Sequence, residues 1–138
     1  MAKLMLSDYK GAIKDFNKAI ELDPYFTKVY YNRGYSRDLL DDHRGAIADY
    51  SKAIELDPNN PHFYSNRGVS KVNLKDYRGA IEDFDIAIEL EPSFTDAYFN
   101  RGISRIAVGN RNLGCKDLSS AKKLGSELAN LSTRKYCE

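Results

Sequence analysis

The sequence has few of the features that mark a disulfide-rich, metal-binding or membrane-spanning protein. It contains two cysteines in 138 residues, which gives neither a disulfide framework nor the ligand spacing of a zinc site. No apolar run approaches the roughly 20 residues that a membrane-spanning helix needs, so we expect no membrane insertion. The formal net charge is +1, so the molecule as a whole has no field that would attract nucleic acid or an anionic membrane.

Catalytic motifs are missing as well. The two histidines, His43 and His62, are not spaced with a Cys or Ser as a nucleophile and its base would be, and there is no phosphate-binding loop. We therefore expect a non-catalytic protein without a cofactor or metal. The start of the chain turns polar too soon for a secretory signal, so we expect a cytoplasmic protein unless an upstream leader or anchor has been removed.

What the sequence does contain is a repeated segment. Residues 11–24, 45–58 and 79–92 are close copies of one another, and Gly11, Gly45 and Gly79 each begin one copy. The copies follow at a fixed period of about 34 residues, which is typical of stacked repeats. In such an array each unit buries its apolar side against its neighbours.

Each unit is predicted to form two helices. In the unit that begins at Thr27, residues 27–40 and about 43–56 carry apolar side chains at helical spacing. Asp41 and Asp42 should break the first helix and cap the second, and Pro58 should end the second. Small residues beside a large one, such as Ala46 and Ala53 around Tyr50, favour close helix packing.

The pattern resembles the tetratricopeptide repeat, a helix-turn-helix unit of about 34 residues. The resemblance implies an all-α, right-handed α-solenoid of antiparallel helix pairs, a superhelix that ends in a C-terminal capping helix. The residues that carry it in two consecutive units are Tyr30, Gly34, Ala46, Tyr50, Ala53 and Pro58, and then Tyr64, Gly68, Ala80, Phe84, Ala87 and Pro92.

We expect one domain over residues 1–138. It divides into a partial repeat (1–26), two complete repeats (27–60 and 61–94), a divergent repeat (95–125) and a capping helix (126–138). The first unit keeps only residues 2–6 of its first helix, so we expect a fragment of a longer array. Leu4, Met5 and Leu6 would then leave an apolar edge through which the chain could form a homo-oligomer.

The C-terminal region departs from the repeat. Gly125 replaces the usual Asp-Pro ending and is expected to cap a helix, and Ser126 can start the last one. From Gly109 onward, basic residues exceed acidic ones by three (6 − 3), as suits a polar end cap. Cys115 and Cys137 have two interpretations: partly buried free thiols, or a disulfide if the last two helices fold back on each other.

The resemblance also implies a function. In tetratricopeptide arrays the first helices of the units line a concave groove, so we expect a protein-interaction module that binds a peptide segment of a partner protein there. The candidate contact residues are Lys28, Tyr31, Asn32, Tyr35, His62, Asn66, Val69, Asn73, Phe99, Asn100 and Ile103.

The three asparagines in this set, Asn32, Asn66 and Asn100, occupy the same position in successive units. An amide side chain can bond both the C=O and the N–H of an extended peptide, so the three could hold a backbone without reading its sequence. The alternative is that they hydrogen-bond within the repeats. A family specialisation that clamps a C-terminal carboxylate needs Lys and Arg in the later units, where this chain has His62 and Asp96, so we do not expect that ligand.

A second repeated set pairs opposite charges. Arg33, Arg67 and Arg101 recur where the family usually has a large apolar residue, and each second helix carries an aspartate: Asp15, Asp49, Asp83 and Asp117. We predict structural Arg–Asp ion pairs between the helices, because a partly buried arginine is strongly penalised without a partner. The alternative is a phosphate or acidic-peptide site made by the three arginines.

The sequence is compatible with two other functions. The array could be a structural spacer or self-assembling scaffold, or it could be the targeting module of a larger protein. Nucleic-acid binding is disfavoured by the near-neutral charge and by the recurring Asp/Glu-Pro ending of the units.

Overall fold

The computed structural model describes the backbone of residues 2–138 and the side chains of residues 8–138. The helices of this part of the chain are joined by short turns and loops, and it contains no strand. The helices are α1 (Ala2–Leu22), α2 (Thr27–Leu39), α3 (His43–Leu56), α4 (Pro61–Asn73), α5 (Tyr77–Leu90), α6 (Thr95–Ala107), α7 (Arg111–Lys123) and α8 (Glu127–Tyr136).

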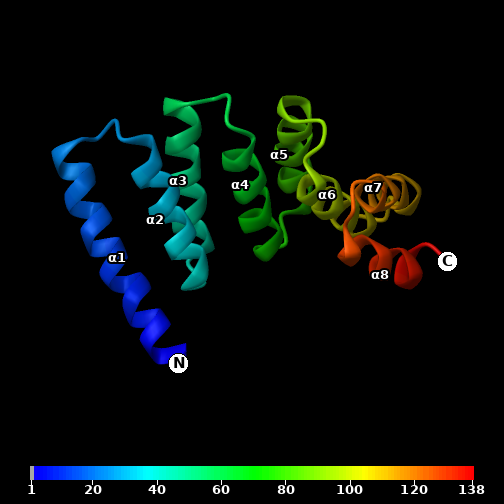
Figure 1. Ribbon diagram of the computed structural model, residues 1–138, viewed down its shortest axis with the longest axis horizontal. Helices are drawn as coiled ribbons and strands as arrows, with labels where there is room; N and C mark the ends of the chain where they lie inside the picture. The colour runs from blue at the N-terminus through cyan, green and yellow to red at the C-terminus, as the bar shows by residue number, and fades with distance from the viewer. Residues whose placement is uncertain (1) are drawn as a thin grey trace.

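The helices stack one after another in chain order, with the two termini at opposite ends of the array (Figure 1). Helices α2 and α3, α4 and α5, and α6 and α7 form pairs, and each pair packs on the next. The buried side chains form three clusters along the array instead of one central core. The predicted all-α solenoid is therefore confirmed.

The turns inside the pairs follow the prediction from the sequence. Asp42 accepts a hydrogen bond from the backbone N–H of Gly45 at 3.0 Å, and Asp76 does the same for Gly79 at 3.1 Å. These side chains satisfy N–H groups that the first turn of a helix leaves unpaired. The residue before each cap, Asp41 or Lys75, has a positive φ of 61° or 63°, which ends the preceding helix.

Small residues let the paired helices approach closely. Ala46, Tyr50 and Ala53 of α3 are fully buried. A Cβ atom added to Gly34 of α2 would lie 2.9 Å from the Tyr50 ring, which is too close for any side chain. Glycine at this place in α2 is therefore required by packing and not by backbone conformation.

The first unit differs from the prediction. Residues 2–6 were expected to remain from a separate first helix, but α1 runs without interruption from Ala2 to Leu22. Ser7 lies one repeat period before Asp41 and is helical, so this unit has no turn between two helices. The apolar edge expected at Leu4, Met5 and Leu6 lies outside the described side chains.

The C-terminal region forms the expected cap. Gly125 has a φ of 99° and ends α7, and the Ser126 hydroxyl accepts a hydrogen bond from the N–H of Ala129 at 3.1 Å. A disulfide joins Cys115 to Cys137, so the two are not free thiols. Arg111 also donates to the carbonyl of Tyr136 at 2.7 Å, which holds the end of α8 against α7.

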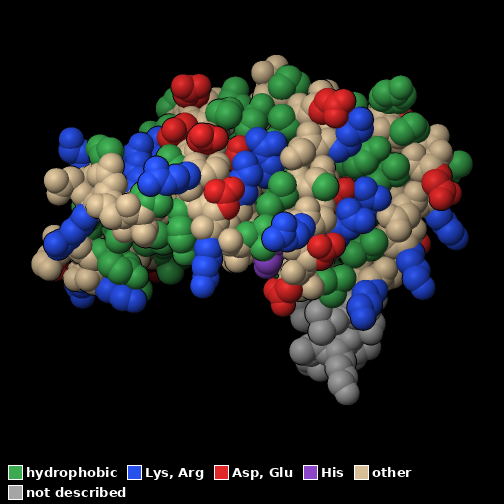
Figure 2. Space-filling view, turned by 180° about the vertical axis from the view of Figure 1, so that it is seen from behind, with side chains coloured by type: hydrophobic (Ala, Val, Ile, Leu, Met, Phe, Trp, Pro, Cys, Tyr) green, Lys and Arg blue, Asp and Glu red, His purple; other side chains and the backbone are tan. Residues whose placement is uncertain are grey.

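Charges on the surface are mixed over most of the array. In the view from behind, acidic and basic side chains alternate over the middle repeats, and basic ones predominate toward the C-terminal end (Figure 2). None of the described helices is both long and apolar enough to cross a membrane.

Candidate functional site

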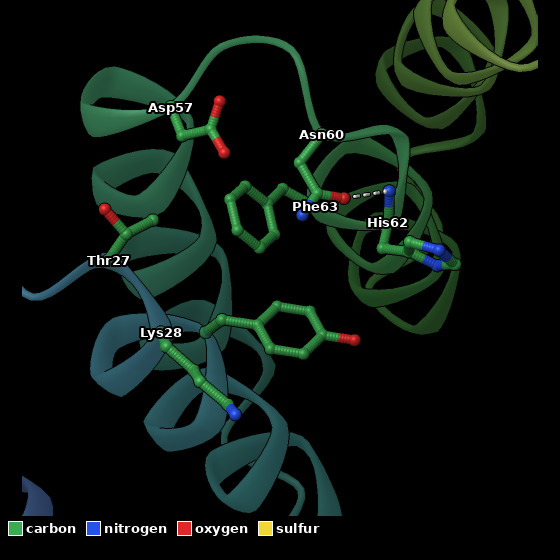
Figure 3. Close-up of a pocket in the computed structure, with 7 residues that line it drawn as sticks. Thr27, Lys28, Asp57, Asn60, His62 and Phe63 are labelled. Atoms are coloured by element: carbon green, nitrogen blue, oxygen red, sulfur yellow. Dashed lines mark hydrogen bonds between the residues drawn. The ribbon is translucent and has the colours of Figure 1, made fainter.

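A cavity of about 510 Å³ lies between the first turns of α2 and α4. Its lining comes from two neighbouring repeats: Thr27, Lys28, Tyr31, Asp57, Asn60, His62 and Phe63. Figure 3 shows the Phe63 ring between Thr27 and Lys28 of α2 on one side and His62 of α4 on the other. Three of the predicted contact residues, Lys28, Tyr31 and His62, therefore meet at one cavity.

The floor of this cavity is aromatic. The ring centroids of Tyr31 and Phe63 are 5.2 Å apart, and those of Tyr31 and Tyr50 are 5.9 Å apart. Burial raises the pKa of Tyr31 above its usual value, and the Tyr31 hydroxyl is protonated at neutral pH, as an unperturbed tyrosine also would be. That hydroxyl accepts a hydrogen bond from the Asn66 amide at 2.9 Å and keeps its own proton for donation.

The rim of the cavity is polar. Lys28 and His62 are exposed, and Asp57 is partly buried at the end of α3. The His62 ring lies 5.0 Å from the ring of Phe94, while Asn60 accepts a hydrogen bond from the His62 backbone N–H at 3.0 Å and fixes the start of α4. A cavity with an apolar floor and a polar rim can hold an apolar side chain and bond the groups beside it.

The other predicted contact residues are spread along α2, α4 and α6. Tyr35 is 53% exposed, Asn73 is exposed, and Asn32 and Asn100 are partly buried. Asn66 makes an internal hydrogen bond to Tyr31, as the alternative interpretation of the asparagines allows.

Three apolar candidates are partly used in packing. Val69 packs against the cluster around Phe84, while Phe99 and Ile103 pack against the cluster around Leu118 that supports α8. A ligand would therefore meet only the part of these side chains that remains accessible.

The repeated arginines bind the repeated aspartates. Each arginine donates through Nε and Nη2 to the two carboxylate oxygens of one aspartate, at 2.6–3.0 Å. The pairs are Arg33 with Asp49, Arg67 with Asp83, and Arg101 with Asp117. The hydrogen bonds to Asp83 raise the pKa of Arg67. Burial alone would lower the pKa of Arg101, but its bonds to Asp117 and Asp85 outweigh that effect and raise it. The two-pronged geometry is the one in which arginine binds carboxylate most strongly.

Two further contacts in each set were not predicted from the sequence. One turn after each arginine, a second cation binds the same carboxylate: Arg37, Lys71 and Arg105 contact Asp49, Asp83 and Asp117 at 2.7–3.0 Å. The remaining nitrogen, Nη1, reaches the preceding repeat, where the acceptors are Asn17, Ser51 and Asp85 at 2.9–3.1 Å. The constant spacing between the second cation and the aspartate in successive units could have revealed the first of these contacts.

The internal contacts leave the three arginines with little capacity for a ligand. Each guanidinium uses Nε, Nη1 and Nη2 in bonds to its own and the preceding repeat. Each also lies 5.6–5.8 Å from the centre of a tyrosine ring one turn earlier in the same helix, namely that of Tyr30, Tyr64 or Tyr98. The arrangement supports a structural role more than a phosphate site.

A second polar network surrounds Asp38. Its carboxylate contacts Nδ1 of His43 at 2.9 Å and accepts hydrogen bonds from the hydroxyls of Tyr50 at 3.0 Å and Ser70 at 2.7 Å. Burial and the charge of Asp38 raise the pKa of Tyr50 far above its usual value. The carboxylate lies at the centre and the histidine does not contact the serine hydroxyl, so this group lacks the geometry of a nucleophile and its base.

Comparison with protein families gives a direct match. Three family models described as tetratricopeptide repeats match residues 5–37, 27–60 and 50–82. Together these matches cover residues 5–82, which is more than half of the chain. No curated protein matches the sequence.

Solved structures share the same architecture. The crystal structure of MamA is 21% identical, with a TM-score of 0.84 over 86% of this chain and 70% of that one. The first repeat domain of Spaghetti (RPAP3) bound to the HSP90 peptide SRMEEVD is 28% identical, with a TM-score of 0.78 over 80% and 89%. The corresponding domain of human RPAP3 is 29% identical, with a TM-score of 0.78 over 82% and 91%.

Proposed function

Because the chain belongs to the tetratricopeptide repeat family of protein-interaction modules, we propose that it binds a peptide segment of a partner protein in the groove along α2, α4 and α6. The cavity between α2 and α4 is the observation that carries this proposal. It would receive an apolar side chain of the peptide between Tyr31 and Phe63. Lys28 and His62 would contact the peptide on either side of that anchor.

The similarity to a peptide-bound domain supports this assignment. The first domain of Spaghetti (RPAP3) is 28% identical and is bound to an HSP90 peptide. The aromatic floor here supplies the kind of buried anchor that dominates the energy of peptide binding. Asn32 and Asn100 lie further along the groove, where their amides would bond the peptide backbone.

We do not expect the HSP90 peptide itself to be the natural ligand. SRMEEVD ends in several carboxylates, and a site for it needs cations in successive units. Lys28 is such a cation in the first complete unit, but the matching groove residues of the later units are His62 and Asp96. The exposed Asp96 would repel an acidic C-terminus.

The test begins with peptides selected for binding from a random display library against the full chain. Their affinities are then measured for the Lys28→Ala, His62→Ala and Asn32→Ala variants. We expect each variant to weaken binding, the double variant of Lys28 and His62 by at least tenfold, because both side chains border the cavity. SRMEEVD, measured in parallel, should bind no better than a scrambled peptide of the same composition.

Two exposed residues on helices that do not line this cavity, Lys18 of α1 and Glu82 of α5, provide the matched controls. Lys18→Ala and Glu82→Ala should leave the affinity unchanged. If the selected peptides lose affinity in these variants and keep it in the three groove variants, the groove is not the binding site.

A further inference from the structure

A second cavity, of about 270 Å³, lies at the C-terminal ends of α4 and α6. Its lining is apolar and aromatic and consists of Val72, Tyr77, Ile103, Ile106, Ala107 and Tyr136. The first five residues belong to two neighbouring repeats, whereas Tyr136 is the last residue of α8. The cavity therefore lies between two helices of the proposed groove, and the C-terminal cap supplies one of its walls.

The wall formed by Tyr136 is held in place by α7. The next residue, Cys137, is joined by the disulfide to Cys115 of α7, and Arg111 of α7 donates to the Tyr136 carbonyl at 2.7 Å. The Arg111 bond is exposed to solvent, and such bonds contribute little net stability. Because the ends of helices fray readily, we expect the turn that carries Tyr136 to move when the covalent bond is broken.

The two cavities lie at opposite ends of α4. His62 and Phe63 line the first cavity at the start of α4, and Val72 lines the second at its end. A rise of about 1.5 Å per residue separates these ends by about 15 Å along the helix, and packed helices lie about 10 Å apart. The cavities are then about 18 Å apart, a distance that about five or six residues of extended peptide span. One peptide can therefore reach both cavities.

We propose that the second cavity receives a second apolar side chain of the bound peptide, and that the disulfide between Cys115 and Cys137 controls this contact. The inference rests on the proposed function, because it needs a peptide in the same groove. With the disulfide formed, Tyr136 closes the cavity against α4 and α6. After reduction the end of α8 moves, and the bound side chain loses one wall of its site.

The disulfide is accessible to the reaction that would break it. Cys115 and Cys137 are only partly buried, so a small dithiol can approach them. One thiolate of the dithiol attacks a sulfur of the pair, the S–S bond breaks and a mixed disulfide forms, and the second thiolate then displaces the remaining protein thiol. Two electrons and two protons pass to the protein, which gains two thiols, and the dithiol becomes a cyclic disulfide. The reverse exchange restores the bond.

The first test uses the protein alone. Methyl NMR signals of Ile103 and Ile106 report on the Tyr136 ring, because an aromatic ring shifts the resonances of methyl groups beside it. We expect a dithiol to shift these signals to the positions that the oxidised Tyr136→Ala variant shows. The dithiol should have no effect on a Cys115→Ser, Cys137→Ser double variant. Unchanged signals on reduction of the wild type would overturn the proposal, because Tyr136 would then stay in place without the disulfide.

The second test uses the peptides selected against the full chain without reductant. Those that bind best should carry two apolar residues about five or six positions apart, and we expect them to bind the reduced protein at least fivefold more weakly. Replacing the second apolar residue with alanine should remove this effect of the dithiol. Tyr136→Ala should weaken binding in both redox states. Arg134→Ala, at an exposed position of α8 outside the cavity, is the matched control and should behave as the wild type.

The groove variants separate a failure of this inference from a failure of the proposed function. If Lys28→Ala and His62→Ala weaken binding and the dithiol does not, the groove binds the peptide but the second cavity takes no part, and the inference is wrong. Tighter binding to the reduced protein would also overturn it, because Tyr136 would then be a lid. If the dithiol shifts the methyl signals but Lys28→Ala and His62→Ala leave the affinity unchanged, the proposed function itself has failed.

Discussion

At the scale of single residues, the buried aspartates explain how a repeat of this family can carry arginine at an apolar position. Asp49, Asp83 and Asp117 are nearly inaccessible to water, and each accepts a two-pronged bond from one arginine and a further contact from a second cation. Such a carboxylate is costly to bury alone but is compensated by several charged donors. The arginine and aspartate are therefore required together.

Removing one of these aspartates should be strongly destabilising. Asp49→Ala leaves Arg33 and Arg37 partly buried without their shared carboxylate, and we expect the free energy of unfolding to fall by about 3–5 kcal/mol. Urea unfolding followed by circular dichroism measures this change. Asp15→Ala is the matched control at the equivalent but exposed position, and it should change stability by no more than about 0.5 kcal/mol. Equal effects of the two substitutions would contradict the structural role of the pair.

The Asp38 network should make the folded state less stable as the pH becomes alkaline. In the folded chain the pKa of Tyr50 lies far above its usual value. In the unfolded chain the Tyr50 hydroxyl should ionise near pH 10. Above pH 10 the unfolded state loses this proton and the folded state keeps it. The stability from this group is therefore complete below pH 10 and declines as the pH rises, by about 1.4 kcal/mol per pH unit.

Tyr50→Phe is the comparison that isolates this effect, since a phenylalanine, Phe84, fills the equivalent place in the next repeat. Urea unfolding between pH 10 and 12 should show a shallower loss of stability in the variant than in the wild type. Parallel curves for the two proteins would show that another group causes the loss.

Contacts within one unit could be predicted from the sequence better than contacts between units. The partners Arg33 and Asp49 belong to the same unit, so their joint recurrence identifies them. The bond from Arg33 to Asn17 crosses into the preceding unit, and its acceptor changes to serine and aspartate in later units. The bond between Ser70 and Asp38 also crosses units, and only the stacked arrangement reveals such contacts.

At the scale of helices, the start and end of α3 and the end of α7 could be predicted because each of these ends has a chemical signal, whereas α2 and α6 begin after Phe26 and Phe94 without a side-chain cap. Asp42 caps α3, Pro58 follows its end, and Gly125 ends α7. The prediction for the first unit was wrong: residues 2–6 were expected to belong to a separate first helix, but Ser7, which has the same place in the repeat as Asp41, is helical and α1 is continuous.

The last helix is held by a disulfide as well as by a small buried contact. Ala129 is the buried residue of α8, while Leu128 and Leu131 are 63% and 64% exposed. A cross-link between residues 22 apart, such as Cys115 and Cys137, stabilises a folded chain by about 3 kcal/mol in the chain-entropy model. Where disulfides persist, this cross-link therefore adds to the contacts that hold α8 in place.

Reduction should loosen α8 and leave the centre of the array unchanged. We expect the backbone amides of α8 to exchange with deuterium at least tenfold faster after treatment with a dithiol, because its remaining contacts are few. The amides of α4 and α5 should exchange at the same rate before and after. A Cys115→Ser, Cys137→Ser double variant should match the reduced wild type, and unchanged protection of α8 in both would contradict this account.

At the scale of the whole molecule, the array is held by contacts between neighbours and not by a common centre. The three buried clusters follow one another along the chain, which is the arrangement that a fixed repeat period predicts. The period could not predict which parts of the groove remain open to a ligand. Phe99 and Ile103 have groove positions in the sequence but partly support α8, because the cap packs against the last repeat.

The bonds of Arg33, Arg67 and Arg101 have a consequence for how such an array can change in length. Each arginine and its principal aspartate lie within one unit, and the acceptor in the preceding unit can be an amide, a hydroxyl or a carboxylate. A gene duplication or deletion that moves one whole unit therefore carries both charges together and meets an acceptable neighbour on either side. The array can lengthen or shorten in evolution by whole units without leaving a buried charge unpaired.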